Sequence, residues 1–387
     1  MQRYVPGTKR VDETAQFVTT VRCREHALPA NKRLFSDPFA AKFLIKAMPH
    51  GERGLPGLDA MLAARTRYMD DLCRDAVDNE GCKQVIILGA GEWRGLGGIV
   101  EEKGGVRGKD EGRDGGIEEG RERSESGSKR ERKRERKREK EGEKEGEKER
   151  EKEREKEGEK EGEKEGEREK EYTTHARPLP LFTVSALGYD TRPVRLPNLA
   201  TIPCFEVDQP ELSKRKRAGY DGLSLSQEQR AHVHLVQVDF NIDSVLKLAQ
   251  HADFKIGAKS VILLEGVSQY LPKASTAATL RNLASLVGPG SMLGMSYVDE
   301  STFGSAEQLC DDPGIVATLL KVVKGKTSPW ISGWSAAAFS SFMREHSWSV
   351  LEDVSVEDLE ERYFSPRGRT AAPFLRIERY STIKLLS

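Results

Sequence analysis

The chain has 387 residues, and its 63 basic and 63 acidic side chains cancel to a formal net charge of zero. This balance gives no electrostatic reason to expect a nucleic-acid or membrane partner, so it favours a small-molecule or peptide substrate. The five cysteines are scattered and lack Cys-x-x-Cys spacing, which indicates neither a disulfide framework nor a zinc site. The N-terminus has no apolar signal core and no stretch is apolar enough to cross a bilayer, so the sequence predicts a soluble, cytoplasmic protein.

Two helices are predicted before the first strand. Residues 35–48 begin with Ser36-Asp37-Pro38, a capping residue followed by proline at an early helical position, and continue with apolar residues at helical spacing. The second helix is expected from about Leu58 to Val77 and contains the sequence ARTRYMDD. The helices therefore come first, and the alternation of strands and helices follows them.

The first predicted strand ends in half of a motif. The apolar run at 84–88 stops at Gly89-Ala90-Gly91, and the sequence YDTRPVRLP starts only at Tyr189. Joined, the two pieces read IILGAG-YDTRPVRLP. Glycine has no Cβ and tolerates positive φ, so backbone at Gly89 and Gly91 can approach a cofactor closely. The two pieces predict one cofactor-binding loop that an insert interrupts.

The predicted insert spans residues 92–187. From about Glu101 to Glu171 it is almost wholly Lys, Arg, Glu and Gly. Burial of so few apolar side chains does not offset the entropic cost of ordering the backbone, about 1–2 kcal/mol per residue, so the insert is expected to be disordered. Purine-only codons encode these four residue types, which suggests a retained intron; a genuine charged loop is the alternative. Nucleic-acid binding by the tract is disfavoured because its acids and bases nearly balance.

The remaining residues, 1–91 and 188–387, suffice for one α/β domain. Apolar runs alternate with helical patterns there, and runs that are apolar on both faces imply a parallel sheet covered on each side, with ligands at its carboxyl edge. The strands are expected at 85–88, 202–207, 234–238, 261–264, 292–297, 347–351 and 375–385, with helices at 242–250, at 274–287 and before the last two strands; the helix at 274–287 stops at Gly288-Pro289-Gly290.

Acidic residues follow three of these strands. Glu206 and Asp208 lie around the end of the second strand, Asp239 follows the third and Glu265 the fourth. An acid after the second strand can accept both hydroxyls of an adenosine ribose, and Asp239 can accept from an adenine amino group. The chain lacks a full Gly-x-Gly-x-x-Gly helix start and a phosphate loop, which favours S-adenosylmethionine over a dinucleotide or ATP.

Several motifs together carry a family resemblance. LGAG, YDTR, RLP, FEVDQP, QVDF and LEGVSQYL, with FSDPFA and ARTRYMDD before them, occur in order between about residues 14 and 384. In these motifs the chain resembles the leucine carboxyl methyltransferase family, and more closely its bacterial-type branch of S-adenosylmethionine-dependent O-methyltransferases. The resemblance implies a class I, Rossmann-like α/β methyltransferase fold: a mostly parallel seven-stranded sheet with helices on both faces, interrupted here by the charged insert.

The resemblance also implies methyl transfer from S-adenosylmethionine to a carboxylate or hydroxyl oxygen by in-line displacement. No catalytic base is identified; an ionised carboxylate acceptor needs none, whereas a hydroxyl acceptor does. Glu206 stays open as an alternative ribose ligand, because it shares a strand face with Asp208. The implied cofactor contacts are Arg65 with the methionine carboxylate, Glu265 near the methionine amino group, Gly89 and Gly91 against the cofactor, Asp208 on the ribose, Asp239 and Phe240 around the adenine, and Asp190 with Arg192 in the loop half beyond the insert.

The methyl acceptor is not revealed by the sequence. The segment from Ser301 to Gly333 and the N-terminal helices are expected to cover its pocket, and a phosphatase C-terminal leucine, a free carboxylic acid and a small phenol all stay open. Tyr270 and Tyr297 are candidates for the pocket lining, with core packing as the alternative. Oligomeric state is likewise open.

Other functions remain as alternatives. Because Gly91 is followed by Glu92 instead of Tyr189, cofactor binding by the chain as written is expected to be weakened. One alternative is therefore a catalytically impaired methyltransferase-like protein whose insert acts as a tether or interaction arm, and another is a nucleotide-dependent oxidoreductase. A serine hydrolase is disfavoured by the lack of a Gly-x-Ser-x-Gly elbow. His232 and His234 have a spacing that metals use, but no third ligand is evident, so no metal is predicted.

Overall fold

The computed structural model describes residues 9–44, 57–89, 189–238, 243–304, 308–310, 312, 314–317 and 330–386. The chain divides into two compact units, Met1–Gly95 with Leu181–Ser387, and Leu96–Pro180. All described residues belong to the first unit. The predicted insert at 92–187 lies outside them, so its disorder remains a prediction.

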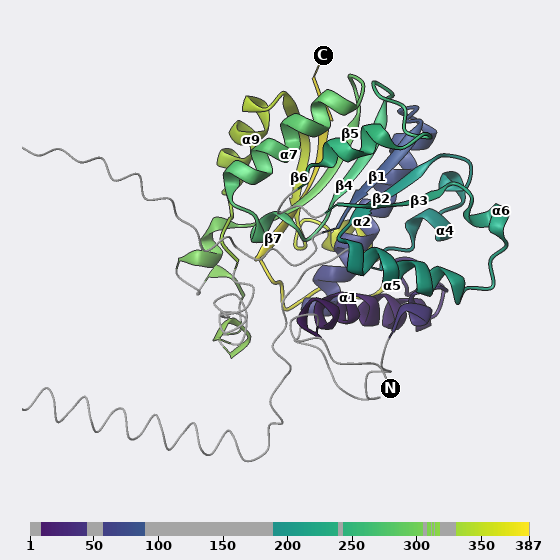
Figure 1. Cartoon of the computed structure of the whole chain (residues 1–387). Coiled ribbons are helices and arrows are strands. Elements are labelled where there is room, and N and C mark those ends of the chain that lie inside the picture. The colour runs from purple at the N-terminus through teal and green to yellow at the C-terminus, as the bar shows by residue number, and fades with distance from the viewer. Residues whose placement is uncertain are drawn as a thin grey trace, which may run out of the picture. The chain divides into compact units, whose positions relative to one another are not determined.

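Seven strands form one sheet in the order β3-β2-β1-β4-β5-β7-β6 (Figure 1). Strands β1 to β5 are parallel, and β7 runs antiparallel to both β5 and β6. The predicted mostly parallel, seven-stranded sheet is therefore confirmed. The strands are β1 Gln84–Leu88, β2 Cys204–Asp208, β3 Val233–Gln237, β4 Ser260–Leu264, β5 Met292–Val298, β6 Trp348–Ser355 and β7 Glu378–Leu385.

The central strands are covered on both faces, as their continuous apolar sequences predict. Every residue of β1 and β4 is buried. Successive side chains of a strand point to opposite faces. Val85 and Ile87 accordingly join a core cluster with α2 (Leu58–Asp78), whereas Ile86 and Leu88 join another with α7 (Lys273–Leu286) and α9 (Ala336–Glu345). Figure 1 shows α7 and α9 together on one side of the sheet.

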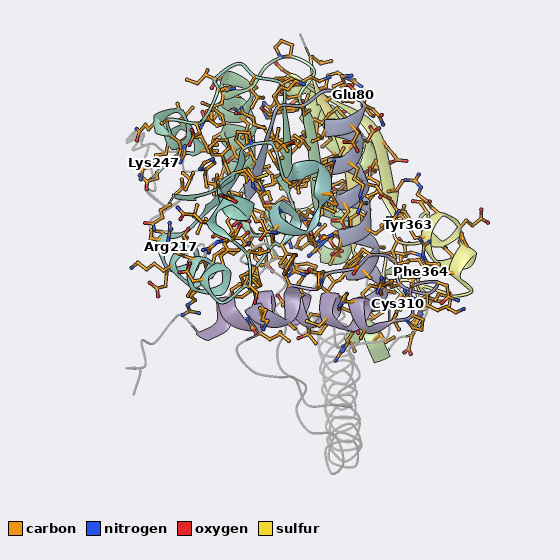
Figure 2. The ribbon with its side chains drawn as sticks, turned by 90° about the vertical axis from the view of Figure 1, so that its right-hand side faces the viewer. Glu80, Arg217, Lys247, Cys310, Tyr363 and Phe364 are labelled. Carbon is orange, nitrogen blue, oxygen red and sulfur yellow. The ribbon has the colours of Figure 1, made fainter. Side chains whose placement is uncertain are left out.

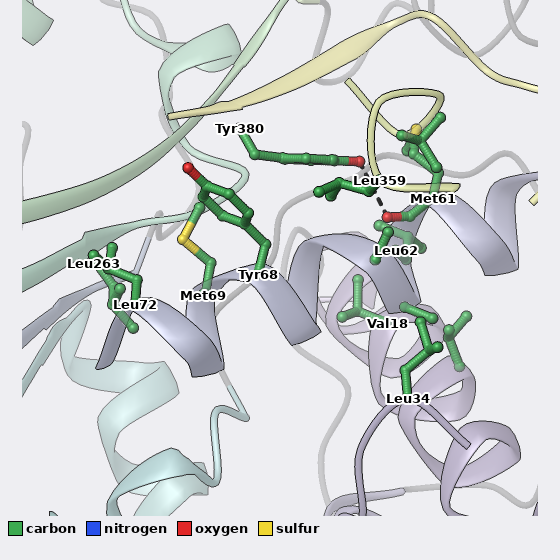
Figure 3. Close-up of a cluster of buried hydrophobic side chains, with 14 of the residues drawn as sticks. Val18, Leu34, Met61, Leu62, Tyr68, Met69, Leu72, Leu263, Leu359 and Tyr380 are labelled. Atoms are coloured by element: carbon green, nitrogen blue, oxygen red, sulfur yellow. Dashed lines mark hydrogen bonds between the residues drawn. The ribbon is translucent and has the colours of Figure 1, made fainter. Parts of the chain in front are cut away.

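Helix α2 lies unusually close to the sheet. A Cβ added to Gly294 of β5 would lie 2.5 Å from Leu72 Cδ2 and 2.7 Å from Met69 Sδ, so any larger residue would require these side chains to move. Figure 3 shows Met69 and Leu72 on the same side of α2 as Leu263 of β4. Nearer the N-terminus of α2, Tyr380 of β7 donates a hydrogen bond to the carbonyl of Met61 at 3.1 Å. Packing of this density fixes the position of the side chains that α2 directs at the sheet edge.

Two predicted helices differ in type from the structure. Within the described part of 35–48 there is only a four-residue 3-10 helix, η1 (Ala40–Phe43). Asp37 Oδ1 accepts from the backbone of Phe39 at 3.2 Å and Ala40 at 3.0 Å, and Oδ2 accepts from Thr191 at 2.7 Å. This carboxylate therefore holds a turn against a distant segment instead of starting a long helix. The helix predicted at 242–250 is a 3-10 helix, η3 (Val245–Gln250).

The other helices surround these layers. In Figure 2, Tyr363, Phe364 and Cys310 lie near one another, and they share the core cluster that α1 and α2 form. No described helix is long and apolar enough to cross a membrane. Further helices are α1 Lys9–Ala27, α4 Arg192–Arg195, η2 Pro197–Leu199, α5 Pro210–Asp221, α6 Gln227–Arg230, η4 Ser268–Tyr270, η5 Glu300–Phe303, the π-helix η7 Glu360–Phe364 and η8 Ser365–Arg367.

Candidate cofactor site

Arg65 of α2 lies at the centre of the candidate site, fully buried at the carboxyl end of β4. Its Nε donates to Glu265 Oε1 at 2.9 Å, and its Nη1 donates to both oxygens of Glu378, at 2.9 and 3.1 Å. Burial disfavours the charged guanidinium, but the carboxylates of Glu378 and Glu265 outweigh burial and raise the pKa of Arg65. The guanidinium is thus a fixed cation between two carboxylates.

Among Arg65, Glu265 and Glu378, two buried atoms have no hydrogen-bond partner within the described residues. They are the donor Arg65 Nη2 and the acceptor Glu265 Oε2. Glu265 Oε2 lies 2.9 Å from Arg192 Nη1, an ion pair without hydrogen-bond geometry. A buried polar atom without a partner costs about 1–3 kcal/mol. Because Arg65 and Glu265 are themselves in contact, they present a cationic donor beside an anionic acceptor. This pair suits the carboxylate and ammonium of an α-amino acid group.

Arg192 connects the loop half beyond the insert to this group. Its Nε donates to Asp70 Oδ1 at 2.7 Å and its Nη1 donates to Asp190 Oδ2 at 2.5 Å. Asp190 Oδ1 also accepts from the backbone of Arg192, so both carboxylate oxygens are engaged. Burial raises the pKa of Asp190, but Arg192 and then Lys216 outweigh it and lower this pKa to about 2. Asp190 therefore orients Arg192, and its predicted contact with a cofactor remains a prediction.

The ion pairs continue as one buried ionic network. Arg195 donates to both oxygens of Asp70 at 2.6 Å, and Arg195 Nε lies 3.7 Å from Asp37 Oδ2, which is 3.1 Å from Arg22 Nε. The network holds one more carboxylate than guanidinium. Its members are Arg22, Asp37, Arg65, Asp70, Asp190, Arg192, Arg195, Glu265 and Glu378.

A pocket lies at the end of β2, beside α5. Asp208 is half-buried there, with Oδ1 accepting from the backbone of Gln209 at 2.8 Å, and burial raises its pKa to about 7. A Cβ at Gly89 would lie 2.2 Å from Asp208 Oδ2, so Gly89 makes room for this carboxylate. The residues lining the pocket include Gly89, Glu206, Asp208, Ser213 and Lys216.

Glu206 faces the same pocket but is more engaged than Asp208. Its Oε1 accepts from Tyr220 at 2.8 Å and pairs with Lys216 at 3.1 Å, whereas Oε2 has no hydrogen-bond partner within the described residues. Burial raises the pKa of Glu206 in spite of the Lys216 charge. Asp208, adjacent to Gly89, is the better placed of the two for a ribose, although Glu206 stays within reach of the pocket.

The predicted site residues fall into three groups. The structure joins Arg65, Glu265 and Asp190 in the ionic network and places Gly89 against Asp208. Gly91, Asp239 and Phe240 lie outside the described residues. Asp37 and Asp70 fall within the quoted motifs FSDPFA and ARTRYMDD, whereas nothing near Glu378 in the sequence marked it. The network members that the sequence did not identify as site residues are Arg22, Asp37, Asp70, Arg195 and Glu378.

Two tyrosines and a histidine that the sequence analysis considered lie in different environments. Tyr270 is buried and lies near the charge of Arg65. Tyr297 stacks on Phe339 with ring centroids 3.9 Å apart and donates to Asp353 at 3.0 Å, so it packs in the core. Nε2 of His232 lies 2.8 Å from the carbonyl oxygen of Pro193.

The fold and the site together define a class of protein. A sheet of order 3-2-1-4-5-7-6 with only β7 antiparallel, carrying acids after β2 and β4, is the class I methyltransferase architecture expected from the sequence. The family model for leucine carboxyl methyltransferase matches residues 15–92 and 184–284, on both sides of the charged tract. The relationship to the leucine carboxyl methyltransferase family is therefore confirmed over these residues.

Curated relatives have consistent names. The chain is 25% identical over 207 residues to the "Putative S-adenosyl-L-methionine-dependent methyltransferase YktD" of Bacillus subtilis, covering 52% of this chain and 65% of that protein. It is 30% identical over 171 residues to a similarly named Frankia alni protein, covering 44% and 56%. The crystal structure of a putative methyltransferase from Thermobifida fusca is 10% identical, covers 86% of this chain and 84% of that chain, and has a TM-score of 0.44. The chain thus spans less than two thirds of the length of the two curated relatives.

Proposed function

We propose that the chain is an S-adenosylmethionine-dependent methyltransferase that methylates a carboxylate or hydroxyl oxygen. One observation carries the proposal: buried Arg65 Nη2 and Glu265 Oε2, on side chains in mutual contact, are without hydrogen-bond partners in the described part of the chain. A methionine end offers a carboxylate for the first and an ammonium for the second. The family match and the names of the relatives support the same reading.

The proposed cofactor position follows the carboxyl edge of the sheet. Arg65 and Glu265 would hold the methionine end, and Asp208, after β2, would accept from the ribose hydroxyls. Gly89 lies between these two places in the strand order, after β1. Asp190 would act through Arg192. Gly91, Asp239 and Phe240 keep the roles that the family resemblance implies.

When bound, S-adenosylmethionine supplies a methyl group on a sulfonium, which an acceptor oxygen attacks in line as S-adenosylhomocysteine leaves. The chain's own contribution is alignment: Arg65 is fixed by three hydrogen bonds and Glu265 is fixed by Arg65 and Arg192. Such fixed groups orient a ligand without further reorganisation. A carboxylate acceptor is already ionised near neutral pH, so alignment and exclusion of water suffice for it.

A second candidate is a catalytically impaired methyltransferase-like protein whose insert serves as a tether or interaction arm. The family match stops at residue 92 and resumes at 184, so an unmatched segment lies within the predicted cofactor loop. Calorimetric titration of S-adenosylmethionine into the full chain, beside a chain in which Gly91 is joined directly to Tyr189, separates the two candidates. Binding by both chains supports the enzyme, and binding by the joined chain alone supports the impaired protein. Binding by neither refutes the proposed cofactor.

The site assignment is tested with Glu265→Gln, which keeps the shape of the side chain but removes its charge. The loss of a charge-assisted contact, about 1.5–3 kcal/mol, should raise the Kd for S-adenosylmethionine roughly 10- to 150-fold. Arg67→Gln is the control. Arg67 lies on α2, as Arg65 does, but it pairs with the partly exposed Asp71 and not with Glu265. An unchanged Kd for Glu265→Gln in a folded protein would contradict the assignment.

A further inference from the structure

A cluster of possible metal ligands lies apart from the cofactor site. His234 of β3, His251 after η3 and Asp253 each offer one ligand atom, and these atoms lie within 4.8 Å of one another. His234 Nδ1 is 3.7 Å from Asp253 Oδ2, and His251 Nδ1 is 3.8 Å from the same oxygen. The carboxylate oxygen thus lies at nearly equal distances from two imidazole nitrogens.

Aromatic packing holds the two imidazoles in place. Phe205 of β2 is fully buried and lies opposite His234 in the register of the β2–β3 pair. Its ring stacks on His234 with centroids 5.0 Å apart and meets His251 edge-on at 5.3 Å, and the two imidazole centroids are 4.6 Å apart. Rings confined in this way lose little further freedom when they bind an ion.

The lone pair of His251 Nδ1 is in a suitable form for a metal ion. The backbone N–H of Asp253 donates to His251 Nδ1 at 3.3 Å, so this nitrogen is the unprotonated one, as metal binding requires. The bond is long, and an ion would take over the same lone pair. The side chains of His234, His251 and Asp253 are 15%, 31% and 58% exposed, so the cluster is open to solvent on the Asp253 side.

We propose that His234, His251 and Asp253 bind a divalent transition-metal ion of the Zn²⁺ class, with water completing the coordination. Zn–N and Zn–O bonds of about 2.0–2.1 Å place tetrahedral ligands about 3.3–3.4 Å apart. The observed N···O separations of 3.7 and 3.8 Å therefore need to close by a few tenths of an ångström. The two imidazole nitrogens lie within 4.8 Å of each other, so they need to approach by at most about 1.5 Å. Two imidazoles with one carboxylate suit Zn²⁺ better than Mg²⁺ or Ca²⁺, which prefer oxygen ligands throughout.

The ion would fasten edge strand β3 to the segment between η3 and β4. Among the described strands β3 is hydrogen-bonded to β2 alone, so it is the edge strand of the described sheet. The connection from β3 to η3 runs through residues 238–244, which contain Asp239 and Phe240. An ion that binds only the folded chain stabilises it by linkage, so the expected effect is a Zn²⁺-dependent rise in Tm. The inference does not rest on the proposed methyltransferase function.

Co²⁺ is the probe for the test, because four-coordinate Co²⁺ absorbs in the visible and Zn²⁺ displaces it. The full chain is titrated alongside Asp253→Asn, His251→Gln and the control His346→Gln, a histidine outside the cluster. Both cluster variants should weaken Co²⁺ binding at least about tenfold, since each removes one of three protein ligands. The control should bind as the unaltered chain does, and Zn²⁺ should raise the Tm of the unaltered chain and the control only.

Asp253→Asn protects the test against misfolding, because Asp253 is largely exposed and its replacement keeps the side-chain shape. Circular dichroism verifies that each variant is folded. Equal Co²⁺ affinity and absorption in the unaltered chain and in both cluster variants would place the ion elsewhere, for instance in the charged tract, and would overturn the proposal. A full chain that shows no saturable Co²⁺ binding would overturn it as well.

Discussion

Gly89 sets how closely the carboxylate of Asp208 approaches the end of β1. We expect Gly89→Ala to push this carboxylate aside, because the new Cβ would lie 2.2 Å from Oδ2. The Kd for S-adenosylmethionine should rise by about tenfold, which corresponds to about 1.4 kcal/mol of lost binding free energy. Calorimetry measures this change. Gly304→Ala is the matched control, because a Cβ there meets only Ser301 O, at an ordinary 3.6 Å; equal effects of the two substitutions would contradict the expected role of Gly89.

Asp208 should make cofactor binding depend on pH. Burial raises its pKa to about 7, and ribose hydroxyls donate to the ionised carboxylate. Affinity for S-adenosylmethionine should therefore increase as the pH rises through about 7, with proton release that calorimetry detects in buffers of different ionisation enthalpy. Asp208→Asn should bind more weakly and lose this dependence. A variant that keeps the same pH profile would assign the titration to another group.

The same pKa shift has a consequence for stability. Between about pH 4 and 7 the folded chain holds the Asp208 proton more tightly than the unfolded chain does, so this residue's contribution to stability falls as the pH rises across that window. Asp208→Asn should flatten that part of the curve of unfolding free energy against pH. Denaturant titrations at several pH values measure it.

The sequence predicted those site residues that lie within a recognisable motif or at the end of a predicted strand. Arg65 and Glu265 were predicted in this way, and the structure brings them into contact. Glu378 was not predicted, because it lies in none of the quoted motifs and a glutamate within a strand usually faces solvent. The roles of these residues toward a cofactor remain predictions, as do those of Gly91, Asp239 and Phe240.

At the level of elements, ion pairs of Arg192 and Arg195 anchor the short helix α4. Arg192→Met would leave the buried carboxylates of Asp70 and Asp190 without this guanidinium, although Arg195 still reaches Asp70. Breaking a buried ion pair from one side costs about 3–5 kcal/mol. We expect a loss of this size in the free energy of unfolding, measured with denaturant.

Arg217→Met is the control for this prediction. Arg217 is exposed on α5, as its outward position in Figure 2 shows, so its replacement should change stability by no more than about 0.5 kcal/mol. If Arg192→Met were as mild as Arg217→Met, the ion pairs of Arg192 would not anchor α4.

The strands were easier to predict than the helices. β1 and β4 are apolar at successive positions because helices cover both faces, and that pattern is visible in the sequence. The long helix predicted at 35–48 was wrong in type, although Asp37 does cap the backbone of Phe39 and Ala40 through Oδ1. Its Oδ2 is held by Thr191 and by Arg22, which are distant in the chain. Long-range ion pairs of this kind leave no local pattern.

For the whole molecule, the buried ionic network predicts sensitivity to acid. Burial raises the pKa of Asp190 and Asp70, but nearby arginines outweigh it and lower both values, that of Asp190 to about 2. The unfolded chain then binds more protons than the folded chain between about pH 4 and pH 2, so this stability is lost as the pH falls through that range. Urea midpoints measured down to about pH 2 test it, and a flat profile would mean that the network does not stabilise the fold through its charges.

The ionic network also spans the two halves of the chain. Strand β1 lies between β2 and β4, and Asp70, before the tract, is held by Arg192 and Arg195, after it. Covalent continuity through the tract is therefore not what keeps these halves together. A protease that cuts within the tract should therefore yield two fragments that copurify and separate only in denaturant. The separated fragments should reassemble when they are mixed, which is fragment complementation.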